Sequence, residues 1–254
     1  MKKIIKILAM LIAGFALCAN AATISKSGSY WYVNGGGEIT IDTGDVFTNS
    51  YFDGGPLDIG NTSSGNHLII DGANVKVNNG TGNIYIGGVS GLNNMMELKN
   101  GATLSGGDIR IGYGSSGNRV ILGENSKLTA SSSFVSYAGN TLEFAGGAMS
   151  ATSILYIETG SEIVVSGNYA KDETIFSWSG IHSGAGYISS ANALLAKFNA
   201  AYGDGTYFGL STGSANGANS IVVLKDVIPE PASVLMVVAV AGVVGFYRRF
   251  FCKL

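Results

Sequence analysis

Few residues between Ala22 and Asp226 have side chains suited to chemistry. This stretch holds two histidines, His67 and His182, and no cysteine, so it offers neither a thiolate nucleophile nor a thiolate metal site. No motif joins either histidine to a serine or a carboxylate. The alternation around His67 places it on the outward side of a short strand, where we expect a solvated structural role. The sequence therefore indicates no catalytic residue, no bound cofactor and no resident metal.

Aspartates are the next candidates, because β-helical polysaccharide lyases combine clustered aspartates with Ca²⁺ and a basic residue. Asp71 and Asp108 fall at different places in their repeats, so we do not expect them to meet in one site. The Gly35–Gly37 run lacks the lysine and the strand-to-helix context of a phosphate-binding loop. Calcium binding stays an alternative for the aspartates, and a nucleotide site is not expected.

Aromatic rings on outward positions form a third candidate, because flat rings can stack against sugars. The candidates are Trp31, Tyr85, Tyr113 and Tyr137. The alternative is that these rings pack within the fold. The sequence leaves both interpretations open.

The composition limits the partners of this chain. Its 254 residues are 46% hydrophobic and 13% charged, which is enough for one domain with a real core. The stretch 22–226 has 9 basic and 16 acidic residues, a net charge of −7. An acidic body argues against a phosphate-binding face, so nucleic acid is not an expected partner.

Short strands recur through residues 65–167. Four units each begin with an asparagine followed by apolar residues spaced by one, and their starts are 28, 24 and 22 residues apart: 66–70, 94–98, 118–122 and 140–144. A second strand follows in each unit, at 72–75, 101–104, 125–128 and 147–149. A third follows at 83–86, 108–111, 133–136 and 153–156. Period-two alternation predicts strands, and the Gly, Asn and Ser residues between them predict turns.

Units of this length with three short strands predict an all-β fold, a parallel β-helix or β-solenoid of about six rungs. They resemble autotransporter-like repeats, in which inward residues stack on the next rung and turn asparagines form ladders. Residues 30–33 and 38–41 are expected to begin the coil, and residues 168–226 to form an irregular cap with a helix at 190–202 and a last strand at 220–224. An antiparallel β-sandwich is the alternative.

The first 21 residues have the pattern of a secretory signal peptide. Three lysines precede an uncharged apolar run, and Ala19 and Ala21 supply the small side chains that signal peptidase recognises. Cleavage is expected before Ala22, after export by the Sec machinery. The alternatives are an uncleaved membrane anchor and lipidation at Cys18, where Leu17 stands in place of the small residue that a lipobox requires.

A second addressing signal is expected in residues 227–254. A Pro-Glu-Pro motif precedes an uncharged apolar run at 232–247 and a basic pair: Pro229, Glu230, Pro231, Arg248 and Arg249. The run of 16 residues would span about 24 Å as a transmembrane helix, short of a hydrocarbon core of about 30 Å. Arginines at its end predict that the body lies outside the cytoplasm. An ordinary tail anchor behind a proline-rich linker is the alternative.

This tail resembles the PEP-CTERM sorting signal of Gram-negative bacteria. The resemblance covers only about the last 28 residues and implies nothing about the body. It implies processing by an exosortase in the inner membrane, on the way to the cell envelope, the cell surface or the medium, and it makes exopolysaccharide a candidate partner. Five residues follow the arginine pair, unlike the commonest pattern.

The function expected from the sequence is that of an exported cell-surface or extracellular-matrix protein with a structural or adhesive role and no catalysis. A glycan-acting or glycan-binding β-helix protein is the alternative.

Overall fold

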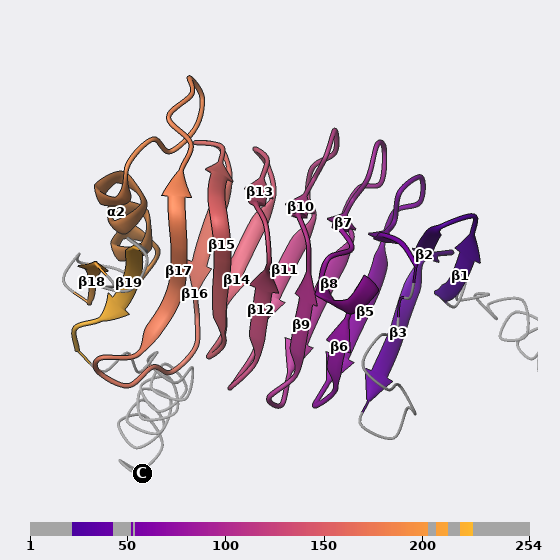
Figure 1. The fold of residues 1–254 in the computed structure, drawn as a ribbon, viewed down its shortest axis with the longest axis horizontal. Helices are drawn as coiled ribbons and strands as arrows, with labels where there is room; N and C mark the ends of the chain where they lie inside the picture. The colour runs from indigo at the N-terminus through magenta and orange to yellow at the C-terminus, as the bar shows by residue number, and fades with distance from the viewer. Residues whose placement is uncertain (1–21, 43–51, 53, 203–206, 213–218, 226–254) are drawn as a thin grey trace, which may run out of the picture.

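The chain winds into a parallel β-solenoid of about six turns (Figure 1). The computed structural model describes residues 22–42, 52, 54–202, 207–212 and 219–225. Each complete turn contributes a strand to each of three rows, and strands of successive turns pair in parallel. The predicted solenoid is thereby confirmed, and the alternative of an antiparallel sandwich is wrong for this part of the chain.

The first row is a parallel sheet of six strands. In spatial order they are β3 (Gly37–Asp42), β5 (Asn66–Asp71), β8 (Met95–Lys99), β11 (Arg119–Leu122), β14 (Thr141–Phe144) and β16 (Glu162–Val165). Leu68, Met96, Val120 and Leu142 occupy one register position and are all buried. Each strand therefore presents one alternating set of apolar side chains to the interior.

The other two rows belong to one sheet because β15 (Ala148–Ile157) runs through both. The second row contains β6 (Asn74–Lys76), β9 (Thr103–Gly106), β12 (Lys127–Ala130) and the first half of β15. The third row contains β2 (Tyr30–Asn34), β4 (Leu57–Ile59), β7 (Ile84–Ile86), β10 (Ile109–Ile111), β13 (Phe134–Ser136) and the second half of β15. A short 3-10 turn, η1 (Asn78–Gly80), connects β6 to β7.

A ladder of four buried asparagines fixes the turns that enter four of the six first-row strands. The Oδ1 of Asn94 accepts hydrogen bonds from the backbone N–H of Asn66 at 3.0 Å and from its Nδ2 at 2.7 Å. Asn118 repeats both bonds one turn later, and Asn140 repeats them again. These bonds satisfy polar groups that would otherwise be buried without partners. The predicted asparagine ladder is confirmed.

Different elements close the two ends of the coil. At the N-terminal end β1 (Thr23–Ser27) pairs antiparallel with β2. At the C-terminal end β17 (Thr174–Ile181) pairs with β15, then antiparallel with β19 (Asn219–Val223), which pairs with β18 (Phe208–Thr212). Helix α2 (Ala191–Tyr202) covers the same end. Parallel pairing therefore continues to Ile181, beyond the expected boundary at residue 167.

Helix α2 fits the predicted capping helix in position and in packing. The Oγ of Ser190 accepts a hydrogen bond from the Ala193 N–H at 3.2 Å, an N-cap that starts the helix. Leu194 and Phe198 are fully buried, and the Phe198 ring lies 5.1 Å from that of Phe144 in the first row. The helix thus closes the apolar interior at the end of the coil that the structure describes.

Candidate ligand-binding face

The outward side of the third row carries a row of tyrosines. Register pairing aligns six outward positions on consecutive strands: Tyr32, Asp58, Tyr85, Arg110, Val135 and Tyr156. Turns beside these strands add further rings. We call this surface the tyrosine face, defined by Tyr30, Tyr32, Tyr85, Tyr113, Tyr137, Tyr156 and Tyr187. Each ring is at least partly exposed, and Tyr113 is 49% exposed.

A hollow of about 340 Å³ lies at the N-terminal half of this face. It is lined by Tyr30, Tyr32, Asp58, Asn61, Tyr85, Gly88, Val89, Arg110 and Tyr113. We call it the first hollow. Four of these nine residues are tyrosines, and three carry polar or charged side chains, a combination of rings and a few polar groups that occurs in small-ligand sites.

Asp58 is the most deeply buried polar residue of the first hollow. Its side chain is only 5% exposed, and its Oδ1 has no hydrogen-bond partner. Burial raises the pKa of this carboxyl to about 7, because removal from water disfavours the charged form. A buried carboxyl oxygen without a hydrogen-bond partner is rare in folded proteins. The exceptions, and carboxyls with a strongly raised pKa, are found preferentially at functional sites.

Arg110 stands two strands beyond Asp58 and is held in place by its own neighbours. One guanidinium nitrogen donates to Asp108 Oδ2 at 3.0 Å. The guanidinium also lies 5.7 Å from the ring centre of Tyr85 and 5.8 Å from that of Tyr113. Burial acts to raise the pKa of Asp108, but hydrogen bonds from Ser133, Ser132 and Arg110 outweigh it and lower that pKa. The charge of Arg110 is therefore compensated within the protein.

A second hollow of about 390 Å³ adjoins the first on the side of the later turns. Its lining includes Leu92, Ser115, Tyr137 and Glu158. Tyr113 of the first hollow and Tyr137 of the second meet edge to face, with ring centres 5.9 Å apart. The two hollows therefore lie on either side of this pair of rings, and we call the two hollows and the rings between them the track.

Aromatic groups extend this track to the last turn. The Tyr156 ring lies 4.7 Å from the His182 ring and 6.2 Å from the Tyr187 ring. His182 and Tyr187 also meet edge to face at 4.9 Å. His182 thus belongs to an aromatic cluster and has no nearby ion-pair partner among the described residues.

Three of the four aromatic candidates from the sequence belong to this face: Tyr85, Tyr113 and Tyr137. Trp31 does not, because it aligns with inward-facing Leu57 and packs edge to face on Phe52 at 5.7 Å. Sequence reasoning missed Tyr32, Asp58, Arg110 and Tyr156 as partners of the same column. The available signal was the middle residue of each third-row strand, which register pairing now aligns.

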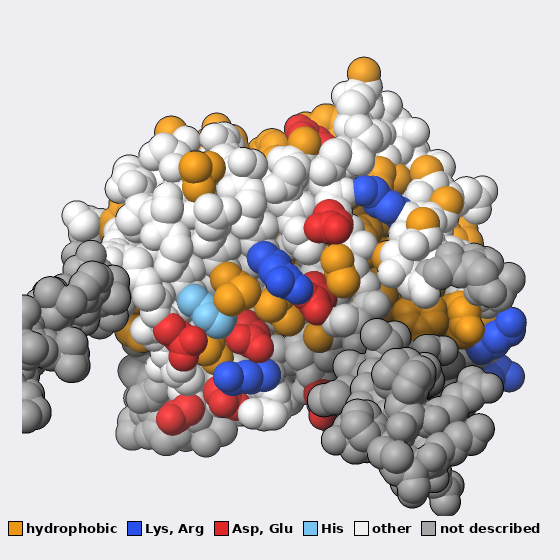
Figure 2. All heavy atoms as spheres, turned by 180° about the vertical axis from the view of Figure 1, so that it is seen from behind, with side chains coloured by type: hydrophobic (Ala, Val, Ile, Leu, Met, Phe, Trp, Pro, Cys, Tyr) orange, Lys and Arg blue, Asp and Glu red, His pale blue; other side chains and the backbone are white. Residues whose placement is uncertain are grey.

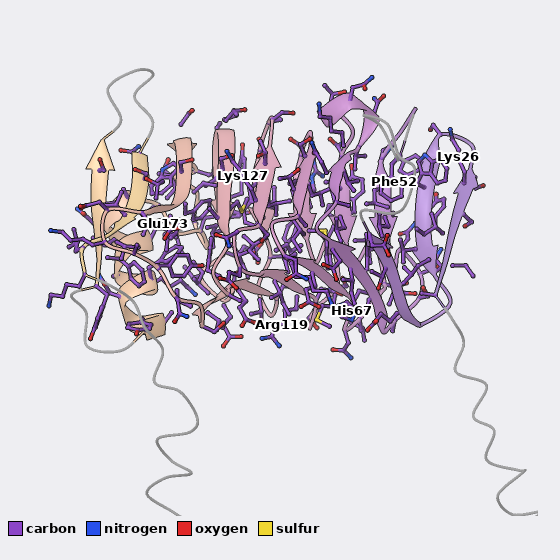
Figure 3. All side chains as sticks on the ribbon, turned by 90° about the horizontal axis from the view of Figure 1, so that it is seen from below. Lys26, Phe52, His67, Arg119, Lys127 and Glu173 are labelled. Carbon is purple, nitrogen blue, oxygen red and sulfur yellow. The ribbon has the colours of Figure 1, made fainter. Side chains whose placement is uncertain are left out.

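The opposite side of the coil carries a different surface, composed of mixed charges. His67 lies between two carboxylates, with Nδ1 3.4 Å from Glu38 and Nε2 3.2 Å from Glu97. Arg119 pairs with Glu143 on the same sheet. Figure 2 shows acidic and basic side chains gathered there, and Figure 3 shows His67 and Arg119 on the side of the coil away from Lys127.

The aspartates considered for calcium lie apart. Asp71 is on the first row near Lys99, whereas Asp108 precedes β10 on the third row. Within the described residues no group of three or more His, Cys, Asp or Glu side chains has the arrangement of a metal site. The described third-row side thus presents exposed rings and two hollows, each lined by one carboxylate.

The addressing residues fall outside the described part of the chain. These are Ala19 and Ala21 of the signal peptide, and Pro229, Glu230, Pro231, Arg248 and Arg249 of the sorting tail. The apolar run 232–247 falls outside it as well. Among the residues that the structure does describe, α2 is too short and too polar to cross a bilayer, and no other helix could do so.

Fold and face together define a parallel β-solenoid with an aromatic track along one side. Comparison with protein-family models, with curated proteins and with solved structures gave no match to this chain.

Proposed function

We propose that this protein is exported to the cell surface or extracellular matrix and binds polysaccharide along the tyrosine face, without catalysing a reaction on it. The observation that carries the proposal is the tyrosine face itself, a row of accessible rings that follows the coil from β2 to β15. Aromatic rings stack on the apolar faces of sugar units, and a row of them suits an extended polymer. The acidic body and the paired state of Arg110 disfavour an anionic chain such as a nucleic acid.

Export and sorting rest on the two terminal segments. The signal peptide would bring the chain across the inner membrane, and an exosortase acting at Pro229-Glu230-Pro231 would release or re-anchor the body. A surface location would place the tyrosine face next to exopolysaccharide. The mature mass and location of the protein in cells, with and without a changed Pro-Glu-Pro motif, test this half of the proposal, and it falls if neither changes.

Binding is tested with the full chain on a panel of neutral, acidic and amino polysaccharides, by retardation in polymer-containing gels. We expect retardation by at least one polymer, with no new reducing ends released. The double variant Tyr113→Ala/Tyr137→Ala should no longer be retarded, because these two rings lie between the hollows, where the polymer would stack on them. Leu224→Ala is the control, since Leu224 is a 47% exposed apolar residue on the C-terminal cap. Equal retardation of both variants contradicts the proposal, and turnover of a polymer contradicts the absence of catalysis.

A further inference from the structure

The first hollow combines a buried carboxyl with aromatic walls, and this combination selects a particular chemistry. We propose that the first hollow is a subsite for a protonated amine, so that the polysaccharide recognised by this face carries free amino-sugar units. This inference rests on the proposed polysaccharide binding and specifies its ligand.

Asp58 provides the negative partner for such an amine. It lies at an outward register position between Tyr32 and Tyr85, and it lines the hollow. No ion pair among the described residues involves it, and its Oδ1 accepts no hydrogen bond. A ligand ammonium would supply both the missing charge and the missing donor. A structural carboxyl would have these partners within the fold.

The tyrosines provide walls that already hold a cation. Arg110 places its guanidinium within 6 Å of the ring centres of Tyr85 and Tyr113. Asp58 lies on the other side of Tyr85, on the adjacent strand β4. An ammonium over Asp58 would therefore contact tyrosine rings in the same kind of cation–π arrangement.

The charges around the track disfavour the other ligand classes. Among the described residues, Arg110 is the one basic side chain that lines either hollow, and Asp108 neutralises it. Asp58 and Glu158 would repel a uronic acid or a sulfated sugar. A neutral sugar would leave the ionised form of this buried carboxyl without a counter-charge. A cationic sugar satisfies the groups that are present.

The titration of Asp58 adds a dependence on pH. The groups that face it are Tyr32 from β2, Tyr85 from β7, Arg110 from β10 and the turn residues Tyr30, Asn61 and Tyr113. With its pKa raised to about 7 by burial, Asp58 is mostly protonated at pH 5 and half ionised at pH 7. Affinity for an ammonium should therefore rise between these values, whereas affinity for an uncharged sugar should not.

The test uses three hexasaccharides with one β-1,4-linked backbone that differ only at C2. Glucosamine hexamer carries an ammonium, its N-acetylated form an acetamide, and cellohexaose a hydroxyl. We expect the full chain, purified in detergent, to bind the glucosamine hexamer about tenfold more tightly at pH 7 than the other two, by titration calorimetry. Asp58→Asn should abolish the preference, and the control Glu124→Gln, at an exposed carboxyl in the turn before β12 away from both hollows, should keep it.

The outcomes separate this inference from the function on which it rests. Equal binding of the three hexamers, lost in Tyr113→Ala, overturns the amine subsite and leaves polysaccharide binding intact. Binding of none overturns the amine subsite, and the polymer panel then decides the proposed function. A preference that survives Asp58→Asn also overturns the subsite. The rise of wild-type affinity for the glucosamine hexamer between pH 5 and pH 7 needs no variant, and a flat profile counts against the inference.

Discussion

Asp58 shows most directly how a single position departs from what folding alone would select. Its neighbours on adjacent strands are Tyr32 and Tyr85, and the residue is only 5% exposed. Burial without a counter-charge is unfavourable, so a fold selected only for stability would place an uncharged side chain here. The cost is consistent with a ligand group that completes the site.

The unfavourable burial of the ionised Asp58 carboxyl predicts an unusual pH dependence of the free energy of unfolding. The folded-state pKa of Asp58, about 7, exceeds its ordinary value of 3.8, so the folded chain binds more protons between these values. Its contribution to stability should therefore be fully present below pH 4 and be lost as the pH rises to 7. Asp58→Asn should remove this fall and stabilise the protein at pH 8 by roughly 4 kcal/mol at most. Urea unfolding of both proteins from pH 4 to pH 8 measures the difference, and parallel profiles would contradict it.

A glycine beside the asparagine ladder gives a second prediction at this scale. Gly87 has φ +70°, and a Cβ there would come within 2.3 Å of the Asn118 side chain. Gly101 has φ +76° and open space around its Cβ position, so it is the matched control. Both alanine variants meet backbone strain of about 1–2 kcal/mol. Gly87→Ala should lose about 1–3 kcal/mol more, because it also displaces the ladder.

Urea unfolding of the two glycine variants separates these contributions. Equal losses would mean that Asn118 moves aside without cost, and the ladder would then not be the reason for glycine at this position.

At the scale of elements, the C-terminal cap protects the open end of the coil. Phe198 of α2 is fully buried against Phe144, Phe176 and Phe208. Phe198→Ala should lower the free energy of unfolding by about 3–5 kcal/mol. It should also promote association, because a loosened helix uncovers the last strands. Asn192→Ala, on the exposed side of the same helix, is the control.

Chemical denaturation and light scattering during heating follow the two effects of the cap variants. An unchanged scattering onset for Phe198→Ala would show that α2 stabilises the coil without shielding its end.

The repeating elements were predictable because stacked turns impose one residue type at equivalent positions. The ladder asparagines and the apolar pair after each of them mark four first-row strands directly. The sequence pattern matched Ser153 to Ser133 in the last third-row strand. The structure pairs Phe134 with Leu155, so this sequence alignment is wrong by one residue. Ile154 takes the position of Ser133 instead, and is 37% exposed. Because of this one-residue shift, the sequence pattern did not align Tyr156 with the outward residues of the other third-row strands.

The candidate site was only partly visible in the sequence for a related reason. Leu57–Ile59 precedes the clear repeats, so nothing in the pattern showed that Asp58 stacks beside Tyr85. That relation exists only through the pairing of β4 with β7. Periodicity predicts which side of a strand faces outward, but it does not predict which outward residues a neighbouring turn covers.

At the scale of the whole molecule, the coil separates two kinds of surface. The first row presents alternating charges that pair with one another, such as Arg119 with Glu143. Mixed charges on a protein surface favour solubility. The third row presents tyrosine rings and the two hollows instead. A solenoid suits this division, because each row extends one chemical surface over the full length of the coil.

The length of the tyrosine face predicts how binding depends on ligand length. From β2 to β15 the face crosses five strand intervals, and at about 4.8 Å each these extend over roughly 24 Å. Each added sugar unit should engage further rings until an oligomer reaches from Tyr32 to Tyr156. Affinity should therefore increase steeply from disaccharide to an oligomer of that span and then level off. Titration with glucosamine oligomers of increasing length measures the curve, and Tyr156→Ala should shorten the length at which it levels. A disaccharide that binds as tightly as the long oligomers would confine recognition to a single hollow and contradict a role for the whole face.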